Sequence, residues 1–158
     1  VGIRICVGVY LATSKGRMRL RSLDPSVQPE LLYNLLETEE DLARMREGVR
    51  AAVEMFKHPA FEPLVDRRIE PLDSDLESDD SLDRWLRREV TTAQHIAGTC
   101  KMGPASDPWA VVDQYGNVHG IGGLTIADAS IMPDCVRANT NATTMMIGER
   151  IADFLVRG

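Results

Sequence analysis

Cysteine is scarce in this sequence, and long apolar runs are missing from it. The three cysteines among its 158 residues are Cys6, Cys100 and Cys135. Their odd number and wide spacing disfavour a disulfide framework and favour reduced thiols, so we expect a cytoplasmic setting. No apolar stretch approaches the roughly 20 residues of a membrane-spanning helix, and no basic segment leads into an apolar one as in a signal peptide. We therefore expect neither a membrane anchor nor secretion.

The sequence also lacks the excess of positive charge that is typical of nucleic-acid-binding proteins. Its net charge is −6. Residues 1–23 hold five basic and no acidic side chains, but Arg17, Arg19 and Arg21 alternate with Met18 and Leu20. That alternation indicates a half-buried strand with a solvated face and not a basic arm. Nucleic acid is therefore not expected as a partner.

Hydrophobic residues make up 44% of the chain, enough for one ordinary core. An apolar run at residues 3–12, a turn at 13–16 and a second run at 17–22 predict a β-hairpin. Thr38 and the spacing of the apolar residues after it predict a helix that begins there and ends before Pro59. The length of 158 residues, together with this apolar content, indicates a single domain, or one domain with part of another.

The second half mixes short strands with irregular, glycine-rich segments. An acidic loop at residues 70–81 lacks the glycine and the terminal glutamate of an EF-hand, so a solvated loop that caps a helix at 82–92 is favoured over a calcium site. Short strands are predicted at 111–113 and 124–127. A final helix is predicted at 142–156, with Asn139 or Asn141 as its N-cap.

The most informative stretch is residues 94–103, in which His95 precedes a turn rich in glycine. Gly98 and Gly103 would weaken a helix and add nothing to a strand, which indicates a backbone held close to something. Zinc is one possibility, but His95, Cys100, His119 and Cys135 lack the short spacing of paired ligands, so no metal site is predicted. Cys100 could also be a nucleophile with His95 as its base, although a small buried thiol is the simpler interpretation.

A third possibility is that His95 is the base of an alcohol oxidation. Neutral imidazole can accept the hydroxyl proton near neutral pH, and the resulting imidazolium stabilises an alkoxide. A second polar group such as Asn139 would hold the hydroxyl between two partners. The hydride needs an acceptor that protein cannot supply, so this possibility requires a cofactor.

Several ordered blocks resemble the carboxy-terminal part of the glucose-methanol-choline (GMC) family of FAD-dependent oxidoreductases, and among its branches the choline-dehydrogenase-like one. The blocks are His95-x-x-Gly98-Thr99-x-x-Met102-Gly103, Val112-Asp113, Gly123-Leu124 to Asp128-Ala129-Ser130-x-Met132-Pro133, Asn139-x-Asn141-Ala142-Thr143, and Met146-Ile147-Gly148-Glu149-Arg150-x-Ala152-Asp153. Residues 1–94 fit more loosely. Together the blocks are highly specific, although no single one would be.

The resemblance implies an α+β fold: a mainly antiparallel sheet with flanking helices, which is the GMC substrate-binding domain, plus the last strand and helix of an FAD-binding Rossmann-like domain. It assigns residues 1–94 to the substrate-binding region. Residues 95–158 become the catalytic loop and the segment that completes the FAD domain. The Gly-x-Gly-x-x-Gly turn that holds the ADP part of FAD is not in this sequence. The FAD-binding half is therefore expected upstream, in the same chain or in a separate one.

The resemblance also implies roles for single residues. His95 matches the catalytic base, which removes the hydroxyl proton of an alcohol substrate while hydride passes from carbon to flavin N5, and Asn139 matches its partner. Contacts with FAD are implied for Asp128, Ala129, Asn141, Ala142 and Thr143. The family normally has proline where this chain has Thr140. Two alternatives stay open: an inactive or partner-dependent interaction module, and a lyase that uses FAD without redox turnover.

Overall fold

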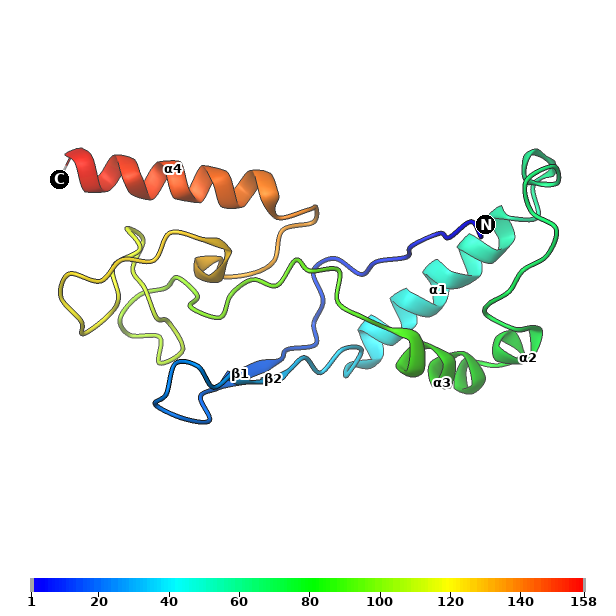
Figure 1. Ribbon diagram of the computed structural model, residues 1–158, viewed down its shortest axis with the longest axis horizontal. Helices are drawn as coiled ribbons and strands as arrows, with labels where there is room; N and C mark the ends of the chain where they lie inside the picture. Colours follow the sequence, from blue (N-terminus) through cyan, green and yellow to red (C-terminus); the bar gives the residue numbers. More distant parts are fainter. Residues whose placement is uncertain (1, 158) are drawn as a thin grey trace. The chain divides into compact units, whose positions relative to one another are not determined.

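The computed structural model describes residues 2–157, and these form two compact units (Figure 1). The first unit combines the residues up to Gly16 with Leu32–Thr91. The second combines Arg17–Leu31 with the residues from Thr92 onward. The boundary at Thr91 separates two sets of contacts, and each unit has its own apolar cluster. The assignment of residues 1–94 and 95–158 to substrate and cofactor functions stays a prediction.

The first unit is built around helix α1 (Glu39–Met55), which packs against helix α3 (Asp79–Glu89). Two short elements, η1 (Pro59–Phe61) and α2 (Asp73–Leu76), lie between them in the sequence. The apolar residues recur every three or four positions along α1, so they share one face and meet their counterparts on α3. The buried cluster consists of Leu36, Leu42, Met45, Val49, Leu82 and Leu86.

Thr38 caps α1 as predicted, because its side chain accepts a hydrogen bond from the Asp41 N–H. Asp41 does not return the bond as in a capping box. Its carboxylate is buried and accepts the N–H groups of Thr13 and Ser14, at 3.0 and 2.7 Å. Burial raises the pKa of Asp41, but hydrogen bonds from Ser14 and Thr13 lower it by more, so this pKa lies below its usual value. Asp41 thus ties the N-terminal segment to α1.

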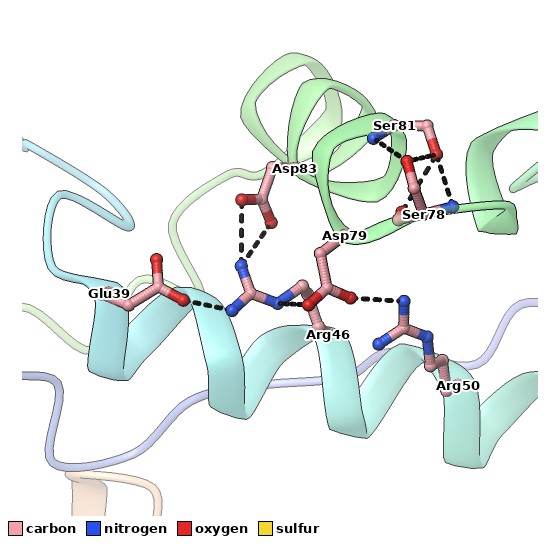
Figure 2. A network of polar contacts seen from close by, with 7 residues as sticks. All are labelled: Glu39, Arg46, Arg50, Ser78, Asp79, Ser81 and Asp83. Atoms are coloured by element: carbon pink, nitrogen blue, oxygen red, sulfur yellow. Dashed lines mark hydrogen bonds and ion pairs between the residues drawn. The ribbon is translucent and has the colours of Figure 1, made fainter.

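Arg46 on α1 is the centre of a network of ion pairs with α3 (Figure 2). Both of its bonds to the Asp83 carboxylate measure 2.9 Å, and it also bonds to Glu39. The Asp79 carboxylate accepts a hydrogen bond from Arg50 at 2.6 Å. The hydrogen bonds from Arg46 to Glu39 and then to Asp83 raise the pKa of Arg46. Three of the acidic residues after position 70, Asp73, Asp79 and Asp83, therefore pair with arginines of the first unit. No group of ligands suited to a metal ion occurs among residues 2–157.

The predicted hairpin between residues 3–12 and 17–22 is wrong. Strand β1 (Arg17–Arg19) pairs instead with β2 (Glu30–Leu32), in a two-stranded antiparallel sheet. Residues 3–12 keep the alternation of a strand, since Val7 and Val9 pack on the first cluster while their neighbours are exposed. Alternation reports which side chains are buried, but a strand also needs a hydrogen-bonded neighbour. In the described part of the chain this segment has no strand assignment.

Gly48 explains how Val7 reaches the surface of α1. A Cβ atom built on Gly48 would lie 2.6 Å from Cγ1 of Val7. Glycine in a helix interior costs about 1 kcal/mol relative to alanine. Here the absence of a side chain at Gly48 leaves the space in which the N-terminal segment packs against the helix.

The second unit contains one long helix, α4 (Asn141–Arg157), and an irregular segment that lies beside it (Figure 1). The short helix η2 (Ala129–Ile131) contacts α4. Val112, Ile131 and Ile151 form the buried cluster between these segments. The strands predicted at 111–113 and 124–127 are reduced to isolated bridges, Met102 to Val112, Val112 to Val118 and Asn117 to Thr125.

The α+β class is confirmed, with antiparallel strand pairing and flanking helices. The C-terminal helix is present at the predicted position. The helix predicted at 82–92 begins earlier, at Asp79, because Ser78 supplies the N-cap. Within the described residues, no helix has both the length and the apolar character needed to cross a membrane.

We predict that Asp41→Asn lowers the free energy of unfolding of the first unit by about 1–3 kcal/mol near neutral pH, because an amide cannot accept both N–H groups. A lowered carboxylate pKa stabilises the fold above the unfolded pKa, and that stability is lost as the pH falls through the folded pKa. The wild type should therefore lose stability below about pH 4, while the variant shows a weaker dependence.

Urea unfolding in a Trp109→Phe background, where Trp85 is the remaining tryptophan, measures this unit. Glu40→Gln is the matched control, since it removes the same charge from an exposed position in the same helical turn. Equal losses in the two variants would contradict a specific function for the Asp41 carboxylate.

Candidate functional site

His95 is held between an unusual backbone turn and the start of α4. Gln94 has a φ angle of 63°, and its N–H bonds to Oγ1 of Thr92 at 3.0 Å. Such left-handed backbone is rare for residues other than glycine, because it costs free energy. Residues held in this conformation cluster at functional sites. The His95 ring is half-buried, and its Nδ1 lies 3.1 Å from Oγ1 of Thr140. Thr140 itself is 8% exposed.

The loop after His95 is fixed by a short series of backbone hydrogen bonds. The N–H groups of Gly98, Cys100 and Met102 donate to the carbonyls of residues 129, 130 and 131, at 3.3, 2.9 and 2.8 Å. Gly98 has a φ of 79°, and a Cβ atom there would lie 3.2 Å from the Met132 carbonyl oxygen. The backbone conformation and the nearby Met132 carbonyl thus favour glycine at position 98. The close approach of a ligand, which the sequence suggests, would be a second cause.

Asp128 and Ala129, two predicted cofactor contacts, lie where this loop is attached. One carboxylate oxygen of Asp128 accepts the Ser130 N–H at 2.8 Å and so caps η2. The Ala129 carbonyl accepts the Gly98 N–H. The structure therefore connects these two residues to the loop that carries His95, and the Asp128 side chain is exposed. Their contact with FAD stays a prediction.

Asn139 and Asn141 flank Thr140, the residue that contacts His95. Neither asparagine is the N-cap of α4, because the helix begins at Asn141 and Thr140 immediately precedes it. The Thr140 carbonyl accepts the Thr144 N–H at 2.8 Å, which closes the first turn. Asn139 is exposed, one residue from the contact with His95. Its function as the second member of a catalytic pair stays a prediction.

The first turn of α4 suits a ligand that gains negative charge. Asn141 and Ala142 are exposed and Thr143 is half-buried, and all three side chains are small. Among the described residues, α1 and α3 carry acidic side chains in their first turns, while α4 carries none. The partial positive charge and N–H groups of the α4 start are thus not offset by a carboxylate in that turn. These residues fit the reducible ring of a flavin.

Other candidates from the sequence have structural explanations. His119 Nε2 bonds to the Gly103 carbonyl at 3.0 Å, and no metal-binding group of three or more His, Cys, Asp or Glu occurs in residues 2–157. Asp113 caps the turn that follows it: burial raises its pKa, but the N–H groups of Asn117 and Tyr115 lower it by more. The cysteines are free thiols, and burial raises the pKa of Cys135.

Thr140 and Gln94 are the site residues that sequence reasoning missed. Gln94 gives no signal, because a left-handed glutamine cannot be recognised from its neighbours. Thr140 does give one: it has a hydroxyl at the position for which the family resemblance implies proline. From the sequence alone, that difference concerns only the freedom of the backbone. In the structure, the threonine side chain makes the hydrogen bond to His95.

Comparison with known proteins identifies relatives of this chain. The family model described as GMC oxidoreductase matches residues 12–148. The oxygen-dependent choline dehydrogenase of Cronobacter sakazakii is 43% identical over 152 residues, which are 96% of this chain and 27% of that protein. The Escherichia coli O127:H6 protein of the same name is 42% identical over 157 residues, 99% of this chain and 28% of its own length.

Solved structures give the same result. Pyridoxine 4-oxidase from Mesorbium loti superposes with a TM-score of 0.86 at 27% identity, over 94% of this chain and 28% of that one. A formate oxidase from Aspergillus oryzae RIB40, studied for its FAD modification, has a TM-score of 0.79 at 32% identity, over 90% of this chain and 24% of its own.

The fold and the relatives thus define the class as that of the GMC oxidoreductases. The chain belongs to the GMC oxidoreductase family and is similar to its choline dehydrogenases. It spans about a quarter of the length of the curated relatives that it matches.

We predict that Gly98→Ala weakens the attachment of the loop by about 1–2 kcal/mol, because alanine is strained at a positive φ. Hydrogen exchange of the Cys100 and Met102 amides should become about 5- to 30-fold faster. Gly122→Ala is the control, since a Cβ atom there meets nothing within 4 Å. Unchanged exchange in Gly98→Ala would contradict the importance of this backbone conformation.

Proposed function

We propose that this chain supplies the catalytic base and part of the flavin site of an FAD-dependent alcohol oxidoreductase. One observation carries the proposal: a half-buried imidazole, His95, is hydrogen-bonded at 3.1 Å to the residue that precedes α4. A proton acceptor and the positive end of a helix are thereby joined in one small region. Family membership supports the choice of chemistry.

His95 would act through Nε2, since Nδ1 is bonded to Thr140. The hydroxyl proton of the alcohol passes to Nε2, and the electrons of the broken O–H bond remain on oxygen. Asn139 would donate from its amide to the same oxygen and hold it in place. FAD, when bound, would supply the acceptor for the hydride that leaves the substrate carbon. The exposed start of α4, with Asn141, Ala142 and Thr143, would stabilise the negative charge that then develops.

The relatives guide the choice of substrate. Several are named oxygen-dependent choline dehydrogenase, and the structural neighbours include a pyridoxine oxidase and an aryl-alcohol oxidase. A small alcohol is therefore the proposed substrate class, with choline as the first compound to test. The upstream FAD-binding half is the proposed partner, either in the same polypeptide or as a separate chain.

We predict that, in the complete flavoenzyme, His95→Ala slows reduction of the flavin by alcohol about 100- to 10,000-fold, the usual contribution of a general base. Stopped-flow absorbance measures the reduction, and flavin content should remain within about twofold of the wild type. His58→Ala removes an exposed histidine of the first unit and is the control.

Unchanged reduction kinetics in His95→Ala would remove His95 from the mechanism. If the wild type binds FAD but no alcohol reduces it, the lyase alternative is favoured over alcohol oxidation.

A second prediction concerns residues 1–158 alone. Because this stretch has no Gly-x-Gly-x-x-Gly turn for the pyrophosphate, we expect it to lose FAD on dialysis. Addition of a polypeptide that carries such a turn should restore retention. A yellow chain with stoichiometric flavin after dialysis would contradict this expectation, and the absorbance spectrum measures it.

A further inference from the structure

The Thr140 hydroxyl contacts Nδ1 of His95, where it can determine which ring nitrogen carries the proton. We propose that Thr140 is a positioning residue: its Oγ1 accepts the Nδ1–H of His95 and thereby holds the imidazole in the tautomer whose Nε2 can accept a proton. The inference rests on the proposed function of His95 as the base.

The geometry permits one productive arrangement. At 3.1 Å, the His95–Thr140 contact has the length of a hydrogen bond, and a threonine hydroxyl can either donate or accept. If the hydroxyl donates, the ring proton of neutral His95 is on Nε2, and that nitrogen cannot act as a base. If the hydroxyl accepts, the proton is on Nδ1 and the lone pair of Nε2 is available. Catalysis by His95 therefore requires Thr140 to be the acceptor.

Thr140 is well fixed for this purpose. Its carbonyl accepts both the N–H and the hydroxyl of Thr144, each at 2.8 Å, so its backbone is tied to the first turn of α4. The residue is 8% exposed, and a β-branched side chain has few χ1 rotamers. The direction of Oγ1 is thus set by the helix, and the helix start thereby controls the orientation of the His95 ring.

The same contact assists the charged form of His95. When the substrate proton reaches Nε2, the ring becomes an imidazolium and its Nδ1–H remains in place. The bond to Thr140 then has a charged donor, and such hydrogen bonds are roughly twice as strong as neutral ones. Thr140 therefore stabilises the state after proton transfer more than the state before it, which is the condition for an effect on rate.

The test compares Thr140→Val, which has nearly the same shape but lacks the acceptor, with Thr140→Ser, which keeps it. In the complete flavoenzyme, Thr140→Val should slow flavin reduction by choline about tenfold, with KM changed less than about twofold. Thr140→Ser should recover the rate to within about threefold of the wild type. Thr125→Val is the matched control, because it removes a hydroxyl of the second unit that bonds to Oδ1 of Asn117 and not to Thr140 or His95.

A double-mutant cycle separates positioning from a structural effect. In a His95→Gln background, Thr140→Val should change the remaining rate by less than about twofold, since there is no imidazole left to position. An equal tenfold loss in both backgrounds would overturn the inference, and so would a wild-type rate in Thr140→Val. If Thr140→Val does not retain flavin, Thr140→Ala replaces it in the same comparison.

A second readout does not depend on turnover. In the wild-type flavoenzyme with 15N-labelled histidine, long-range 1H–15N correlation should show the neutral His95 ring protonated at Nδ1. Thr140→Val should mix the tautomers, while Thr125→Val should not. A neutral wild-type ring protonated at Nε2 would overturn the inference directly. By contrast, if His95→Ala reduces its flavin at the wild-type rate, it is the proposed function that fails.

Discussion

The second unit depends on three backbone hydrogen bonds that join the loop after His95 to residues 129–131. These bonds, from Gly98, Cys100 and Met102, connect two parts of the sequence that are separated by a glycine-rich excursion. The bond from Met102 ends on the carbonyl of Ile131, which belongs to the apolar cluster with Val112 and Ile151. Because the loop has no regular secondary structure of its own, its shape is determined by the segment to which it is bonded. The position of the loop after His95 is thus set by backbone hydrogen bonds.

The first unit is organised differently, by buried charge. Asp41 accepts two N–H groups of the N-terminal segment, and Arg46 pairs with carboxylates of α1 and α3. Removing the carboxylates around Arg46 leaves a buried charge without its counterpart, and removing Asp41 leaves two N–H groups without an acceptor, and both changes are costly. These charges therefore specify which segments meet, while the apolar residues of α1 and α3 supply most of the burial.

The sequence predicts the helices well because their signals are local. Thr38 and the apolar spacing after it place α1 correctly, and the final helix lies at its predicted position. Strand pairing depends on distant partners, so the partner predicted for the run at 3–12 is wrong and β1 pairs with β2. For the site, the resemblance predicts His95 as the base, but the hydrogen bond to its ring comes from Thr140, 45 residues away. No local pattern contains that information.

The two units are interleaved along the chain, since the sequence passes from one to the other after Gly16, after Leu31 and after Thr91. Most of the hairpin of β1 and β2 therefore belongs to the same unit as the residues after Thr91, although the ribosome synthesises the hairpin much earlier than those residues. A polypeptide cut at a single position, such as Thr91, cannot contain one complete unit without a piece of the other. Gene fusions, circular permutations and domain exchanges within this family thus need at least two matched junctions to keep each unit whole.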